Sequence, residues 1–80
     1  YPNPSQGQTY FTFRLERAAE VNLSLYDLQG REVASLVKGE MPVGEHEIRW
    51  EASQLPGQLY LCRLQVGDQQ LTRSLWLTNP

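Results

Sequence analysis

Apolar and polar residues alternate along most of this chain, and that pattern restricts its fold more than any other feature. The alternating segments are 9–15, 21–26, 47–51 and 71–78. A period of two over four to eight residues is typical of a β-strand with one buried face. Segment 31–38 also fits a helical turn, but its shortness and its position between two turns favour a strand. Segment 51–56 fits a brief turn of helix.

Turn-forming residues separate these segments at Gln29-Gly30, between Gly39 and Gly44, at Pro56-Gly57 and at Gly67-Asp68. Short strands at such regular spacing predict an all-β fold, an immunoglobulin-like antiparallel β-sandwich of six to seven short strands without a long helix. The register of the alternation predicts which side chains are largely buried. They are Phe11, Phe13, Val21, Leu23, Leu25, Val33, Ile48, Trp50, Leu64 and Leu75.

Eighty residues predict one domain, 1–80, with a single core of modest stability. Residues 1–8 have the composition of a linker, with two prolines in Tyr1-Pro2-Asn3-Pro4. We therefore expect this segment to come from within a longer polypeptide. No basic-then-apolar start is visible, so no secretory signal peptide is predicted.

Charge, apolar run length and cysteine content each exclude one class of partner, segment or site. The net charge is −2 and the lysines and arginines are scattered singly, so nucleic acid is not an expected partner. The longest apolar stretches are only a few residues long, so no transmembrane segment is predicted. Cys62 is the only cysteine, which rules out an internal disulfide and a multi-cysteine metal site.

Candidate catalytic groups are few. Cys62 and His46 would be the only nucleophile and base, but both fall in apolar strand patterns, whereas catalytic thiols need an exposed, electropositive setting. Glu45, Glu47 and Glu51 share a strand face with Arg49 among them, which is typical of a solvated face rather than a calcium site. The sequence therefore predicts no catalytic residue, no metal, no cofactor and no enzymatic activity.

Aromatic residues have two interpretations. Tyr60-Leu61-Cys62 resembles the Tyr-x-Cys of an immunoglobulin strand, whose tyrosine makes a corner hydrogen bond, although the partner cysteine is missing. Tyr10, Trp50 and Trp76 suggest a sugar-binding platform, but their scatter over three strands favours core and edge positions.

The turn Asp27-Leu28-Gln29-Gly30-Arg31 carries both charge signs beside a lone glycine. We expect Gly30 to adopt a positive φ and Asp27 to accept hydrogen bonds from backbone amides of the turn. Exposed polar loops also commonly carry binding, so the same turn is a candidate recognition surface.

A family resemblance covers essentially the whole chain. The motifs that carry it are Tyr1-Pro2-Asn3-Pro4, Phe11-x-Phe13-x-Leu15, Val21-x-Leu23-x-Leu25-Tyr26-Asp27-Leu28-Gln29-Gly30-Arg31-Glu32-Val33, Gly39-Glu40, Pro42-x-Gly44-x-His46-x-Ile48-x-Trp50, Tyr60 and Arg63-Leu64. In this order they resemble the C-terminal sorting domain, type A, of the type IX (Por) secretion system. The chain departs from that pattern in having Gln58, where the family usually has glycine, and in lacking a lysine near residue 80.

The resemblance implies a non-catalytic export address. It implies an N-terminal cargo domain in the same chain, recognition by the translocon and shuttle proteins at the outer membrane, and removal by a sortase-like C-terminal signal peptidase. The cargo would pass from the periplasm to the cell surface or the medium of a Gram-negative bacterium. The candidate recognition residues are Asp27, Gly30, Arg31, Glu32, Arg73, Leu75, Trp76 and Leu77, and the expected structural turn residues are Pro2, Asn3, Pro4, Gly44, Gly57 and Tyr60.

Two other function classes remain open at this point. One is an immunoglobulin-like spacer domain with a purely structural role. The other is a small carbohydrate-binding module of a secreted glycoside hydrolase, which would need aromatic side chains coplanar on one exposed face.

Overall fold

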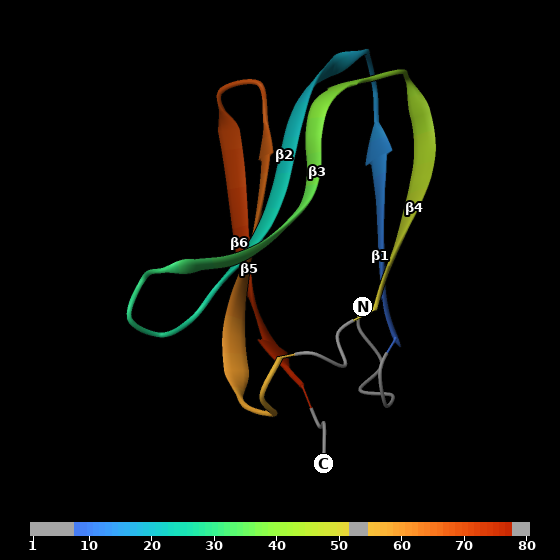
Figure 1. The fold of residues 1–80 in the computed structure, drawn as a ribbon. Coiled ribbons are helices and arrows are strands. Elements are labelled where there is room, and N and C mark those ends of the chain that lie inside the picture. Colours follow the sequence, from blue (N-terminus) through green and yellow to red (C-terminus); the bar gives the residue numbers. More distant parts are fainter. Residues whose placement is uncertain (1–7, 52–54, 78–80) are drawn as a thin grey trace.

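The computed structural model describes residues 8–51 and 55–77, and these residues form six β-strands (Figure 1). The strands are β1 (Gln8–Leu15), β2 (Ala19–Tyr26), β3 (Glu32–Met41), β4 (Gly44–Glu51), β5 (Leu59–Val66) and β6 (Gln69–Trp76). The described residues contain no helix, and hence no helix that could cross a membrane. The helical turn expected at 51–56 lies partly outside the described residues. The prolines of the N-terminal segment, Pro2 and Pro4, lie wholly outside them.

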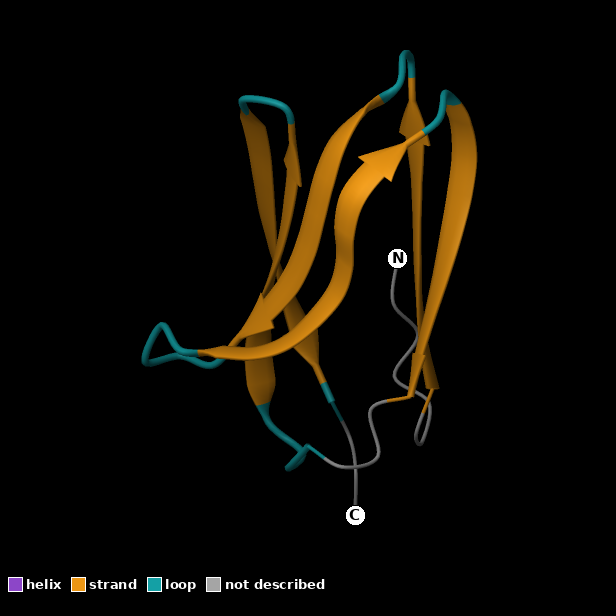
Figure 2. Cartoon of the chain, turned by 45° about the horizontal axis from the view of Figure 1, so that its top comes forward, coloured by secondary structure: helices purple, strands orange, loops and turns teal. Residues whose placement is uncertain are grey.

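The strands form two antiparallel sheets, one with the order β1-β4 and one with the order β3-β2-β5-β6 (Figure 2). The chain passes from the larger sheet to the smaller one through Pro42 and Val43, which connect β3 to β4. The predicted all-β, immunoglobulin-like antiparallel sandwich is therefore confirmed, with six strands in the described residues.

Strand β3 explains the ambiguous pattern of segment 31–38. Its register with β2 shifts twice, between Leu23 and Ser24 and again between Leu25 and Tyr26, so that Leu36 and Val33 have no direct partner on β2. Each bulge inserts an extra residue and changes which face the following side chains occupy. The two bulges thus give a β-strand an apolar spacing that resembles a helix, and the prediction of a strand is confirmed.

The core lies between the two sheets, mainly on β2, β5 and β6. Four of the ten side chains predicted to be largely buried are so: Val21, Leu23, Leu25 and Leu75. Further buried residues on or beside these strands include Leu15, Tyr60, Cys62 and Leu77.

The other six predicted core residues are only half-buried, which corrects the prediction for Phe11, Phe13, Val33, Ile48, Trp50 and Leu64. Four of them belong to the smaller sheet, where both strands are edges, so that each side chain has a neighbouring strand on one side only and stays open to solvent on the other. Val33 lies at a bulge of the edge strand β3, and Leu64 faces the open side between β1 and β6.

Candidate recognition surface

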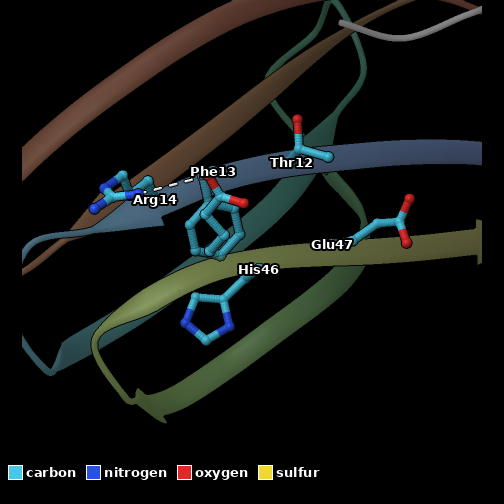
Figure 3. A pocket seen from close by; sticks show the side chains of 6 residues that line it. Thr12, Phe13, Arg14, His46 and Glu47 are labelled. Carbon is cyan, nitrogen blue, oxygen red and sulfur yellow. Dashed lines mark ion pairs between the residues drawn. The ribbon is translucent and has the colours of Figure 1, made fainter.

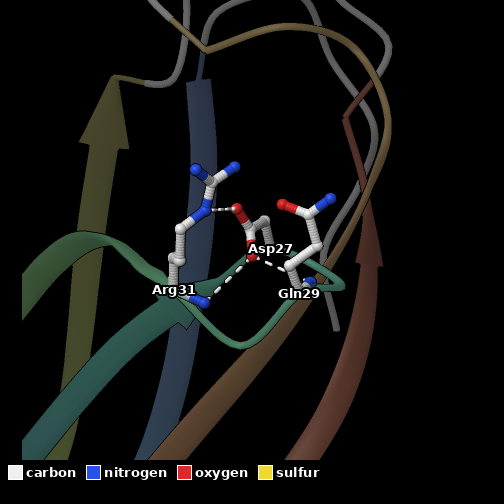
Figure 4. A network of polar contacts seen from close by, with 3 residues as sticks. All are labelled: Asp27, Gln29 and Arg31. Atoms are coloured by element: carbon white, nitrogen blue, oxygen red, sulfur yellow. Dashed lines mark hydrogen bonds and ion pairs between the residues drawn. The ribbon is translucent and has the colours of Figure 1, made fainter.

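The turn between β2 and β3 is built around the carboxylate of Asp27 (Figure 4). Its Oδ1 accepts hydrogen bonds from the backbone N–H of Gln29 at 2.9 Å and of Arg31 at 3.0 Å. Its Oδ2 accepts one from Nε of Arg31 at 2.9 Å. The backbone closes the same turn, because the N–H of Asp27 donates to the Arg31 carbonyl and the N–H of Gly30 donates to the Asp27 carbonyl. Gly30 has φ +89°, a conformation that a residue with a Cβ rarely adopts.

The Asp27 side chain is 9% exposed, while that of Arg31 is 75% exposed. The backbone N–H of Arg31 lowers the pKa of the Asp27 carboxyl, and although burial opposes this, the Arg31 side chain and the Gln29 N–H lower the pKa further. Asp27 is therefore ionised at neutral pH and holds Arg31 by Nε.

An apolar side chain stands beside this cation. Leu28 is 62% exposed at the tip of the turn. Asp27, Leu28, Gln29 and Arg31 line an open hollow of about 320 Å³ together with two residues from the start of β5, Gln58 and Leu59. Leu28 lies in the turn predicted as a recognition surface, whereas the approach of Gln58 and Leu59 to this turn was not predicted from the sequence. A leucine at the tip of an otherwise polar turn was the one signal that could have identified this surface.

Trp76 and Leu77 lie beside Leu59 and Gln58, which line this hollow. Trp76 is the register partner of Leu59, and the N–H of Leu77 donates to the Gln58 carbonyl at 3.0 Å. Trp76 is 62% exposed. We call residues 27–31, Gln58, Leu59 and Trp76 the turn–tail surface. It is formed by three segments of the chain, at residues 27–31, 58–59 and 76.

The other candidate recognition residues lie elsewhere. Leu75 and Leu77 belong to the core, so the folded chain does not present them to a partner. Arg73 pairs in register with Cys62 and lines a groove on the inner side of the larger sheet. Glu32 is exposed at the start of β3, opposite Tyr26. Of the eight candidates, Asp27, Gly30 and Arg31 lie in one turn, and Trp76 lies beside Leu59, which lines the hollow next to that turn.

The expected structural turn residues include one tyrosine corner. Oη of Tyr60 donates a hydrogen bond to the Pro56 carbonyl at 2.7 Å, and the side chain is fully buried. Burial, together with the negative charge of Asp27, raises the pKa of Tyr60, so the phenol stays a donor. Gly44 has φ +127° at the start of β4, and Gly57 is exposed just before β5. Pro2, Asn3 and Pro4 lie outside the described residues.

Cys62 and His46 have structural surroundings. Burial raises the pKa of the Cys62 thiol to about 11, so the thiolate needed for nucleophilic chemistry is scarce. His46 lies on β4, where Nε2 donates to the Pro42 carbonyl at 2.8 Å and the ring lies 5.4 Å from that of Phe13 (Figure 3). The two residues belong to different sheets.

The glutamates of β4 form ion pairs with arginines. Glu45 lies 3.5 Å from Arg14, and Glu47 lies 3.6 Å from Arg49. Among residues 8–51 and 55–77, no group of three or more His, Cys, Asp or Glu side chains is placed to hold a metal ion. Glu45, Glu47 and Glu51 are all exposed, so the acidic face of β4 is a solvated strand face.

Fold and surface together define a small immunoglobulin-like β-sandwich that exposes a hydrogen-bonded β2–β3 turn beside Gln58 and Leu59. The family model described as the secretion system C-terminal sorting domain matches residues 1–78. The chain belongs to this family, whose members are sorting signals of the type IX secretion system rather than catalytic domains. Searches of curated proteins and of solved structures returned no match.

Proposed function

We propose that this chain, as a single domain over residues 1–80, is the C-terminal export address of a larger protein whose cargo domain precedes it. The family match over residues 1–78 carries this proposal. The translocon and shuttle proteins at the outer membrane bind the folded domain, and a sortase-like signal peptidase removes it. The cargo then reaches the cell surface or the medium of a Gram-negative bacterium.

The turn–tail surface is the proposed recognition site. It presents the side chains of Leu28, Arg31 and Trp76 around one end of the larger sheet. Tryptophan and arginine are the residue types that most often dominate the binding energy of protein interfaces. The hydrogen bonds from Arg31 to Asp27 restrict the cation before binding, which lowers the entropy lost when a partner is engaged.

The spacer and carbohydrate-binding alternatives receive no comparable support. Tyr10 and Trp50 lie on the same small sheet, but Tyr10 pairs with Arg49 on the exposed face while Trp50 packs against the core. Trp76 belongs to the other sheet. The three aromatic side chains therefore form no coplanar platform for a sugar.

The test is export of a periplasmic reporter that carries residues 1–80 at its C-terminus, in a host with a working type IX system. We expect Leu28→Ser and Trp76→Ser to retain more reporter in the periplasm than the parent does. Val43→Ser is the matched control, because Val43 is 61% exposed in the β3–β4 connection, outside the turn–tail surface. Melting of each purified variant separates loss of recognition from loss of folding.

Two results would contradict the proposal. Normal export of both variants would remove the turn–tail surface as the recognition site. Failure of the intact 1–80 fusion, in a host that exports its own cargo, would refute the export role and favour the spacer interpretation.

A further inference from the structure

Strand β6 is an open edge of the larger sheet in the described part of the chain. It pairs with β5 on one side and with no described strand on the other. Its residues 69–74 are all exposed, and Arg73 is its only charge. The opposite edge, β3, is interrupted by two bulges and carries Glu32, Lys38 and Glu40. Bulges and charges are the usual means of blocking edge-to-edge pairing, and β6 has few of them.

An apolar groove of about 500 Å³ runs along this edge, between β6 and β1. Its floor is formed by the buried side chains of Leu23, Cys62 and Leu75. Tyr10 from β1 and Leu71 from β6 line its rim, and Leu71 is 48% exposed. A strand added to β6 would place every second side chain in this groove, because side chains alternate between the two faces of a sheet.

Arg73 is the one charged residue among those that line the groove. Its register partner Cys62 is buried, which places Arg73 on the groove side of β6. No ion pair or hydrogen bond engages its guanidinium within residues 8–51 and 55–77. The groove therefore combines apolar contacts with a single cation that lacks a carboxylate.

A second copy of this chain is a poor occupant. Two β6 strands paired antiparallel about a two-fold axis near Thr72 or Arg73 would bring the two Arg73 side chains together. Like charges placed directly opposite each other across strands are destabilising. A segment with a carboxylate at the corresponding position complements the groove instead.

We propose that the β6 edge binds an extended segment of a partner protein as an added strand, with apolar side chains in the groove at alternate positions and one carboxylate paired with Arg73. This site is separate from the turn–tail surface, and the inference goes beyond the proposed function.

The probe is the acetylated, amidated peptide Thr-Val-Thr-Glu-Thr-Val-Thr, whose second, fourth and sixth side chains share one face of a strand. Titrated into the isotopically labelled chain, it should shift amide resonances of β6 and of residues 10–12. The same peptide with lysine in place of glutamate should bind at least about tenfold more weakly, because it places a cation beside Arg73.

Charge reversal sharpens the test. Arg73→Glu should exchange the preference, so that the lysine peptide binds more tightly than the glutamate peptide, and Arg73→Gln should abolish the preference. Arg17→Glu, an exposed residue in the β1–β2 connection, alters the net charge as Arg73→Glu does and should leave the preference unchanged.

Three outcomes would overturn the inference. One is that the two peptides bind with equal affinity, or that neither binds at millimolar concentration. Another is a set of shifts centred on residues 27–31. The third is self-association of the chain through β6 that the glutamate peptide does not displace, which would make a second copy the occupant.

Discussion

The Asp27 carboxylate binds Arg31 twice, at its backbone N–H and at Nε, so one buried anion fixes both the path of the turn and the direction of its exposed cation. A surface arginine without such contacts samples many rotamers and loses that freedom on binding. Here the side chain of Arg31 is already restricted by a contact within its own turn.

Asp27 makes stability depend on pH in the acid range. Because the folded chain lowers the pKa of this carboxyl below its usual 3.8, its contribution is fully present above that value and is lost as pH falls through the lower folded value. Denaturation by urea between pH 7 and pH 2 should therefore show the parent exceeding Asp27→Asn in stability at neutral pH, with the difference shrinking below pH 3.8. A difference that stays constant over this range would refute the assignment.

Tyr60→Phe should cost about 1 kcal/mol of unfolding free energy, because it removes the hydrogen bond to Pro56 and leaves a carbonyl without its donor. Tyr26→Phe is the matched control. Arg63 stacks on the Tyr26 ring at 4.6 Å, and this contact survives the loss of the hydroxyl. Equal losses in the two variants, measured by denaturant titration, would argue against a specific role for the tyrosine corner.

Leu25→Ala should destabilise the chain by about 2–5 kcal/mol, since Leu25 is fully buried and its removal leaves a cavity beside Tyr60. Leu28→Ala, three residues further along the chain, should change stability by less than about 0.5 kcal/mol because its side chain faces solvent. Thermal melting distinguishes the two leucines. A large loss from Leu28→Ala would mean that Leu28 supports the fold and would weaken its assignment to recognition.

Cys62 should resist alkylation in the native chain. Its thiol is buried and its pKa is raised to about 11, so little thiolate is present or accessible at pH 8. Iodoacetamide should label the protein slowly in buffer and rapidly in urea, as followed by intact mass. Fast labelling under native conditions would show that the floor of the β1–β6 groove opens readily.

The strands were predictable because half-buried antiparallel strands alternate apolar and polar residues, and the turns because glycine, proline and aspartate occupy them. The exposure of Phe11 and Trp50 was not predictable in this way. Parity assigns them to an inner face, but their half-burial follows from a sheet of only two strands, in which each strand lacks a neighbour on one side.

The candidate site was predictable in part. Asp27 and Gly30 predict a turn from the local sequence alone. The proximity of Leu28 to Gln58 and Leu59 depends instead on β2 and β5 being neighbours in the sheet. Such long-range pairing leaves no local mark in the sequence. Leu75 and Leu77 were assigned to recognition from the resemblance, although alternation alone places them on an inner face with Leu71.

The burial of Leu75 and Leu77 determines how far translation must proceed before the core can be completed. Ribosomes make a chain from its N-terminus, so Leu75 and Leu77 are made after the other buried side chains of residues 8–51 and 55–77. A chain interrupted before Leu75 leaves Leu25 and Tyr60 uncovered and lacks the bond between Leu77 and Gln58. The turn–tail surface thus exists only on copies translated at least as far as Leu77, and a partner that binds it would reject products truncated before that point.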